Sequence, residues 1–353
     1  MLDTIATTLG EKPKFADMKT AHDLISNSGM NWRTYFAKVA WDDDDLEHTD
    51  RWGVTQQNPA PSRRWVEVED QRMVLRSDTR VPLGQVGQSF QEIDNIHAFG
   101  IADPIIAQGG EFVGCGEYER GALAWVQVKM PIDPADVVNG DTVMPYLLIV
   151  TGHTGNRSLT YKMTTIRVVC KNTLYAALKG KTQQSGSIKH SGDIKAKTDF
   201  ATSLLEKHRI FFNDTVKVFQ KFATTTIKQP AVERYFKTIA KVEPRHYKNG
   251  EMTGRPGNMY DKYMTAYHGS RHGAELGRGT VWGAYNAVTA VQDHDMVEEK
   301  RTDTAHKSAK DRAAYQYFEA SPRISQDAFA LASEYADMGE YGRTGEIGNE
   351  INN

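Results

Sequence analysis

The sequence predicts an α+β fold, in which an antiparallel β-rich N-terminal half with short helices is followed by a helical C-terminal half. Three observations support this prediction. Short apolar runs of strand length dominate up to about residue 163, and apolar residues at helical spacing dominate after it. The strands therefore come first and the helices second, an order that favours α+β over α/β. The chain of 353 residues, 39% hydrophobic and 25% charged, has an ordinary globular composition and can bury a sizeable core.

The N-terminal region is predicted to hold one short helix and an acidic loop. Thr20 followed by Asp23 is a capping-box pattern, and the polar segment Ser26–Gly29 predicts the end of that helix. From Asp42 to Ser62 the chain is acidic and contains prolines, and it includes the four consecutive aspartates 42–45. We expect these carboxylates in a solvated loop, because oxygen-ligand cation sites usually space their ligands and add a turn glycine.

Strand patterns follow the acidic stretch. A hairpin is predicted from the apolar runs Trp65–Val68 and Met73–Leu75, with Glu69–Arg72 as its turn. Helical spacing of apolar residues predicts a helix over Phe90–Phe99. Further strands are predicted at residues 81–86, within 111–130, at 146–150 and at 158–163, with a loop at 151–156.

Helical periodicity is predicted to start at Thr165. Apolar residues four apart predict an amphipathic helix from Thr165 to Lys179, followed by a Gly-, Ser- and Lys-rich linker. Further helices are predicted over residues 200–222, 231–240, 258–267, 281–293, 304–318 and 326–338.

These elements divide the chain into five parts. The parts are an N-terminal helix and acidic loop (1–62), an antiparallel sheet with packed helices (63–180), a basic mobile linker (181–198), a helical region (199–340) and a tail (341–353).

Cysteine content and hydropathy predict a cytoplasmic location. Cys115 and Cys170 are too few for a disulfide framework or a zinc quartet, which favours a reducing compartment. The first residues show no secretory signal pattern. No apolar run approaches the roughly 20 residues of a membrane helix, so no membrane partner is expected.

We find no catalytic or cofactor motif in the sequence. A phosphate-binding G-x-x-x-x-G-K-[ST] loop, a dinucleotide fingerprint, an H-E-x-x-H motif and a nucleophile elbow are all missing. His268 and His272 lie four residues apart, a spacing at which two imidazoles can share a metal, but Gly269 and Gly273 interrupt the helix this requires. A protein without enzymatic activity, cofactor or metal is expected, with a metal-dependent DNA enzyme as an alternative.

The net charge of −2 hides a strong segregation of charge along the chain. Residues 1–150 carry 13 Lys and Arg against 23 Asp and Glu, a balance of −10. Residues 151–250 carry 19 against 6, a balance of +13, and residues 251–353 carry 11 against 16, a balance of −5. The basic middle predicts a surface that binds a polyanion. The alternatives are a solvated basic face, or one that pairs with the acidic ends of the protein itself.

A row of cations with interleaved aromatics is what single-stranded nucleic acid requires, because cations hold phosphates and aromatic rings stack on bases. For Tyr161 and Tyr175, packing in the core is the alternative to stacking. The candidate nucleic-acid-binding residues are Arg157, Tyr161, Lys162, Arg167, Lys171, Tyr175, Lys179, Lys181, Lys189, Lys195 and Lys197. We call this set the predicted strip.

Two segments resemble the signatures of a phage/plasmid-like family of unknown function. They are Ile166–Leu174 and Gly279–Thr289, the second followed by Asp293 and His294, and the segments Gly29–Trp32 and Val86–Glu92 fit the same pattern. The resemblance covers roughly residues 20–295 and implies a gene carried by phages or plasmids, without established catalytic residues. The order of elements is also similar to that of phage single-strand annealing recombinases, which form rings or filaments and hold single-stranded DNA in a basic groove.

The resulting hypothesis is an oligomeric single-stranded DNA-binding protein that acts in annealing or recombination in the cytoplasm of a host cell. A homo-oligomeric ring or filament is expected, and a phage nuclease or single-strand-binding protein is a further candidate partner. The alternative is a structural or host-takeover protein whose basic segment binds an acidic protein.

Overall fold

Two antiparallel sheets and a group of helices make up the fold. It is seen in a computed structural model, which describes residues 15–43, 47–49, 52–53, 55–57, 64–155, 159–168, 173–174, 185–187, 194–269, 275–295 and 320–338. The N-terminal half is β-sheet with short helices and the C-terminal half is helical. The predicted α+β class is therefore confirmed.

The larger sheet has seven antiparallel strands. Its main path runs β11–β10–β9–β7–β6, with β8 paired to β9 and β12 paired to β10. Most side chains of β7 and β9 are buried on both faces, which explains why their sequences are continuously apolar. The strands predicted within 111–130, at 146–150 and at 158–163 lie in this sheet, the last of them beginning at Thr160. Its members are β6 (Glu111–Tyr118), β7 (Leu123–Lys129), β8 (Ala135–Val138), β9 (Asp141–Gly152), β10 (Thr160–Arg167), β11 (Thr173–Leu174) and β12 (Ser185–Ser187).

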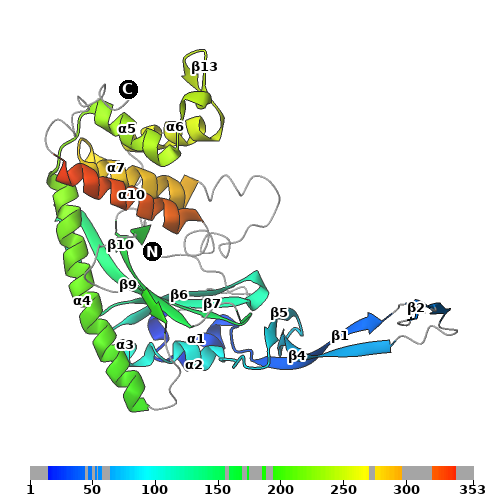
Figure 1. Cartoon of the computed structure of the whole chain (residues 1–353). Helices are drawn as coiled ribbons and strands as arrows, with labels where there is room; N and C mark the ends of the chain where they lie inside the picture. The colour runs from blue at the N-terminus through cyan, green and yellow to red at the C-terminus, as the bar shows by residue number, and fades with distance from the viewer. Residues whose placement is uncertain are drawn as a thin grey trace.

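The smaller sheet continues into a projecting arm. Its strands are β1 (Thr34–Asp43), β4 (Arg64–Arg76) and β5 (Pro82–Gly87) in the order β1–β4–β5. Because β5 pairs only with residues 71–75 of β4, the rest of the ribbon has two strands. This part, residues 39–43 and 64–70, is the arm, and it points away from the rest of the protein (Figure 1). A short hairpin of β2 (Glu47–Thr49) and β3 (Thr55–Gln57) lies between its strands in sequence.

Three predictions for this region are wrong. Residues 69–72 do not form a turn, because β4 is one continuous strand that pairs with β1. The acidic stretch after Asp42 is not simply a loop, since β1 extends through Asp43 and the β2–β3 hairpin follows. The helix predicted from Phe90 begins only at Asn95, and Glu92, which lies before it, accepts a hydrogen bond from Thr34 Oγ1 at 3.0 Å.

Three short helices pack near the larger sheet. They are α1 (Ala21–Ser28), α2 (Asn95–Phe99) and α3 (Asp103–Ala107), and they lie below the sheet in the view of Figure 1. The predicted capping box of α1 is present, because Thr20 Oγ1 accepts from the Asp23 N–H at 3.1 Å and the Asp23 carboxylate accepts from the Thr20 N–H at 2.9 Å. Gly29 ends the helix with a φ of 74°, which is why glycine serves at this position.

Arg76 at the end of β4 joins the smaller sheet to the larger one. Its guanidinium donates to the Glu117 carboxylate on β6 at 2.7 Å and stacks 4.2 Å above the ring of Trp32, whose Nε1 also donates to Glu117. The buried ring of His153 meets Trp32 edge-on at 4.9 Å, and its Nε2 lies 3.1 Å from Asn95 Oδ1. This polar cluster fixes the base of the arm against the body.

The C-terminal half starts with α4 (Ile194–Thr224), a helix of 31 residues that runs along one side of the sheet (Figure 1). Two further helix pairs follow, with α5 and α6 beside each other and α7 packed against α10. A small hairpin of β13 and β14 separates α5 from α6. The bounds are α5 (Gln229–Ala240), η3 (Pro244–His246), β13 (Tyr247–Lys248), β14 (Glu251–Met252), α6 (Gly254–His268), α7 (Val281–Ala290), the π-helical turn η5 (Val291–Asp295) and α10 (Ala320–Asp337).

The prediction of a helix over Thr165–Lys179 is wrong for the residues of this range that the structure describes. Residues 165–167 belong to β10 and residues 173–174 form β11, which pairs back onto β10. Strand pairing overrides the helical spacing here, because residues 165–167 pair with β9 on one side and residues 165–166 pair with β11 on the other. The predicted linker 181–198 is also shorter than expected, because it contains β12 and α4 already begins at Ile194.

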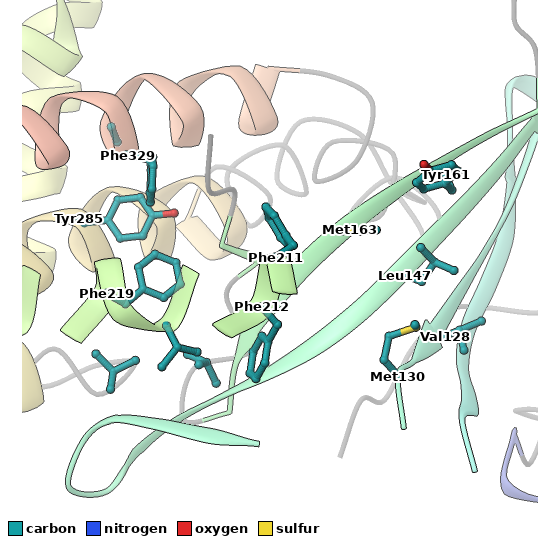
Figure 2. Close-up of a cluster of buried hydrophobic side chains, with 14 of the residues drawn as sticks. Val128, Met130, Leu147, Tyr161, Met163, Phe211, Phe212, Phe219, Tyr285 and Phe329 are labelled. Carbon is teal, nitrogen blue, oxygen red and sulfur yellow. The ribbon is translucent and has the colours of Figure 1, made fainter. Parts of the chain in front are cut away.

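One continuous core joins the sheet to the helices (Figure 2). On the sheet side, Leu147 of β9 and Met163 of β10 belong to the same buried cluster as Phe212 of α4 (Figure 2). On the helical side, Phe219 of α4 lies 5.9 Å from Tyr285 of α7 and 6.1 Å from Phe329 of α10, measured between ring centroids. The helix α4 thus contributes to both parts of the core, and it sets the position of the helical half relative to the sheet.

Candidate functional site

Most of the predicted strip falls outside the described residues. Six of its members cannot be placed on the fold for this reason. They are Arg157, Lys171, Tyr175, Lys179, Lys181 and Lys189. Lys195 and Lys197 lie in the first turn of α4. Of the predicted strip, the structure describes the side chains of Tyr161, Lys162 and Arg167.

Arg167 is buried and takes part in an internal ion pair. Its Nε and Nη2 donate to the two carboxylate oxygens of Asp141 at 2.5 and 2.6 Å, and the two side chains are 1% and 0% exposed. The Trp282 Nε1 of α7 donates to the same carboxylate at 2.7 Å. A guanidinium held in this way cannot reach a phosphate without breaking a buried pair, so its assignment to a nucleic-acid surface is corrected to a structural role.

Tyr161 is also part of the core. It is 5% exposed and belongs to the buried cluster drawn in Figure 2. Its ring meets Phe200 of α4 edge-on at 6.0 Å. Its face is therefore closed to a stacking base, and core packing is the correct alternative. Lys162, the next residue on β10, is half-buried, and burial lowers the pKa of its ammonium to about 8. Lys162 stays a candidate contact that is still protonated at neutral pH.

The structure reveals exposed cations that the predicted strip omitted. Eight lie on α4, on α5 and its flanks, and on the β13 hairpin, all within the same basic window of residues 151–250. They are Lys207, Arg209, Lys217, Lys221, Lys228, Lys241, Arg245 and Lys248, and we call them the exposed basic set. The signal that could have found them was present, because the predicted helix over 200–222 places its charged residues opposite its apolar face.

Some members of the exposed basic set are already neutralised. Lys217 and Lys221 pair with Asp214 and Asp337, and Arg245 pairs with Glu243. The other five, Lys207, Arg209, Lys228, Lys241 and Lys248, form no ion pair with another described residue. Tyr247, next to Lys248 on the hairpin, is 42% exposed and offers an aromatic face beside these charges.

The two sequence segments that carried the resemblance come close together in the fold. Arg167, from the first segment, and Trp282, from the second, both bind Asp141. Gly283 of the second segment packs against the backbone of Gly277, which lies just before that segment. A Cβ on Gly283 would stand 2.2 Å from the Gly277 carbonyl oxygen. Only glycine fits there, so the described part of these segments builds the joint between sheet and helices rather than a binding surface.

The family described as domain of unknown function (DUF932) matches residues 82–315. The chain belongs to this family. No curated protein and no solved structure matches it. Membership of an uncharacterised family agrees with the resemblance of the sequence at that level.

The folded body is larger than the DUF932 match. The matched residues start with β5 and run through η5, so they include the larger sheet, α4 and the Asp141 joint. The arm and α10 lie outside them. Because Phe329 of α10 packs on Phe219 and Tyr285, this DUF932 protein needs the residues beyond 315 to close its core.

Cysteine and histidine are the side chains of the described residues that bear most directly on catalytic or metal chemistry. Cys115 is buried, and burial raises the pKa of its thiol to about 12, so it is not an activated nucleophile. His268 is the last residue of α6, and His272 lies outside the described residues. Within the described ranges no group of three His, Cys, Asp or Glu side chains is arranged to hold a metal ion. No helix in the same ranges is long and apolar enough to cross a membrane.

Proposed function

We propose that this DUF932 protein binds single-stranded DNA and acts as an annealing protein without catalytic chemistry of its own. The observation that carries the proposal is the exposure of the basic middle of the chain. Of the 12 cations in residues 151–250 whose side chains the structure describes, the eight of the exposed basic set face solvent. Five of them, on α4, at the two ends of α5 and on the β13 hairpin, form no ion pair with another described residue, and such cations are suited to contacts with phosphates.

The mechanism is electrostatic. Lysine and arginine side chains on α4, α5 and the β13 hairpin hold the phosphates, and exposed aromatic rings such as Tyr247 support the bases. Bases held in this way stay open to pairing with a complementary strand. Arg167 and Tyr161 are not part of this mechanism, because they are buried.

The affinity for a single-stranded oligonucleotide is expected to fall with salt. Each phosphate contact on a single strand contributes about −0.7 to the slope of log K against log salt. Five contacts give a slope of about −3.5, which is about a hundredfold loss of affinity between roughly 50 and 200 mM salt. Fluorescence anisotropy with labelled oligothymidine at several salt concentrations measures the affinity and this slope. Binding that does not change with salt, or binding only to an acidic protein, contradicts the proposal and favours the protein-partner alternative.

We further propose that the arm mediates assembly into a ring or filament. Trp41 and Trp65, on β1 and β4 of the arm, are 50% and 62% exposed, and Trp52 is 73% exposed. Large apolar side chains gathered on a projecting ribbon are typical of a protein–protein contact. Charge complementarity favours a second copy as the partner, because residues 1–150 carry a balance of −10 and residues 151–250 one of +13, as counted above.

Removing the two arm tryptophans is expected to reduce the assembly to monomers. Trp41→Ser with Trp65→Ser takes away the exposed apolar area without touching the core. Light scattering during size-exclusion chromatography reports the mass. A wild-type chain that is already monomeric, or a variant that keeps the wild-type mass, rules out the arm as the contact.

A further inference from the structure

We infer that a cavity in the helical half binds a nucleotide. The cavity has a volume of about 480 Å³ and lies between α5, α6, η5 and α10. This volume falls within the range of small-molecule sites. Its walls come from four segments that are distant in sequence, and both helix pairs of Figure 1 contribute to it. We call it the α5–α6 pocket.

Charge at the rim points to an anion. Lys241, Arg255 and Arg323 line the pocket together with one acidic residue, Asp327, so the lining carries three positive charges against one negative charge. Their net charge of +2 matches a phosphate dianion. All four side chains are exposed, and the three cations have no ion pair with another residue in the described ranges. The guanidinium groups are the type of donor that binds phosphate oxygens in pairs.

The start of α6 adds a second, independent source of positive potential. Thr253 precedes the helix, but its side chain makes no capping hydrogen bond and donates instead to the His246 carbonyl oxygen at 3.1 Å. The helix has 15 residues, and its Arg255 and Pro256 line the pocket. The partial positive charge of an uncapped helix start favours an anion beside it.

The interior of the pocket is apolar with a polar base. Ile239, Met259 and Ile324 form the apolar wall. At the base, the buried Gln292 of η5 donates from Nε2 to the hydroxyl of Tyr263 at 2.9 Å. A phosphate alone would leave this wall uncovered, whereas a planar base would cover it. A π-helical turn such as η5 is also frequent at functional sites. A ligand that fits the cationic rim, the apolar wall and the polar base has a phosphate, a planar apolar ring and polar atoms on the edge of that ring. A nucleotide has all three parts.

A free nucleotide and a nucleotide unit of a DNA strand present this same chemistry. Lys241 belongs to both the pocket and the exposed basic set, but Arg255, Arg323 and the apolar wall belong to the pocket alone, so the inference goes beyond the proposed function. Calorimetric titration of the full chain with adenosine monophosphate, adenosine and inorganic phosphate tests it. We expect saturable binding of adenosine monophosphate, with at least about tenfold weaker binding of the other two ligands. No saturable binding, or phosphate binding as tight as the nucleotide, overturns the inference.

Two variants locate the site. Arg255→Glu with Arg323→Glu reverses the rim charge, and Met259→Trp fills the cavity without changing any charge. Each is expected to weaken nucleotide binding at least about tenfold. Arg33→Glu with Lys38→Glu makes the same change of charge on exposed residues outside both the pocket and the exposed basic set, and should leave nucleotide binding unchanged. Equal loss in this control variant, or none in the pocket variants, places the nucleotide elsewhere and overturns the inference.

Oligonucleotides separate this inference from the proposed function. If 5′-phosphorylated and unphosphorylated strands bind equally to the wild type and to the pocket variants, while adenosine monophosphate depends on the pocket, the pocket serves free nucleotides. If the oligonucleotides do not bind at all but adenosine monophosphate does, the proposed function is wrong and the inference of a nucleotide site is kept. If strands bind and adenosine monophosphate does not, the pocket fails and the proposed function stands.

Discussion

Replacing Asp141 by alanine is expected to lower the free energy of unfolding by about 3–5 kcal/mol. The substitution leaves the guanidinium of Arg167 buried without its counter-charge and the Nε1 of Trp282 without its acceptor. Because small domains are stable by only about 5–15 kcal/mol, this is a large share of the total. Urea denaturation of the full chain measures it as a shift of the midpoint.

Two further variants give this expectation a control. Lys38 and Glu67 form an exposed ion pair, with side chains 79% and 47% exposed, and Glu67→Ala should cost no more than about 1 kcal/mol. Asp141→Leu combined with Arg167→Met should recover much of the loss, because no buried charge is then left alone. A loss below about 1 kcal/mol for Asp141→Ala would mean that the Asp141 joint does not hold sheet and helices together.

Acid is expected to destabilise the protein well before most carboxylates are protonated. Burial lowers the pKa of His208 to about 3, and burial together with the nearby Arg76 lowers that of His153 to about 4, against an ordinary value of 6.5. The unfolded chain therefore takes up two protons below pH 6.5 that the folded chain does not. Stability is full above that pH and is lost as the pH falls, by about 6 kcal/mol between pH 7 and pH 4.

His208 allows a direct test of this pH dependence. Neither of its ring nitrogens has a hydrogen-bond partner within the described part of the chain, so His208→Leu removes a titrating group without breaking a hydrogen bond. The variant should lose about 3 kcal/mol less than the wild type over the same range. Thermal unfolding followed at several pH values measures it, with His22→Gln on the exposed face of α1 as the control. An unchanged profile for His208→Leu would show that this ring is not buried in solution.

Sequence reasoning succeeded where a few neighbouring residues decide the structure. The capping box of Thr20 and Asp23, with Gly29 at the end of the helix, is such a local signal, and α1 follows it. The order of strands and helices also needed only periodicity. The helix predicted over Thr165–Lys179 failed because pairing of β10 with β9 and β11 determines the backbone there, and that pairing is invisible in a single segment.

The candidate site was harder to predict, because exposure depends on tertiary contacts. Arg167 has the charge of a surface residue, but its partners Asp141 and Trp282 are distant in sequence. The exposed basic set was within reach, since α4 was predicted and its polar face could have been read. The α5–α6 pocket was not, because Lys241, Arg255, Gln292 and Arg323 come together only when four helical segments pack.

The affinity of matched charge variants for single-stranded DNA tests the central claim most directly. Lys207→Glu with Arg209→Glu removes two of the five exposed cations that lack an ion-pair partner in the described structure, whereas Arg33→Glu with Lys38→Glu makes the same charge change on exposed residues outside the basic middle. We predict that the α4 variant weakens binding of oligothymidine at every salt concentration and makes the slope shallower by about 1.4. The control should keep the wild-type affinity within about twofold. Equal affinity of the α4 variant and the wild type, or equal weakening of both variants, would contradict DNA binding through the exposed basic set.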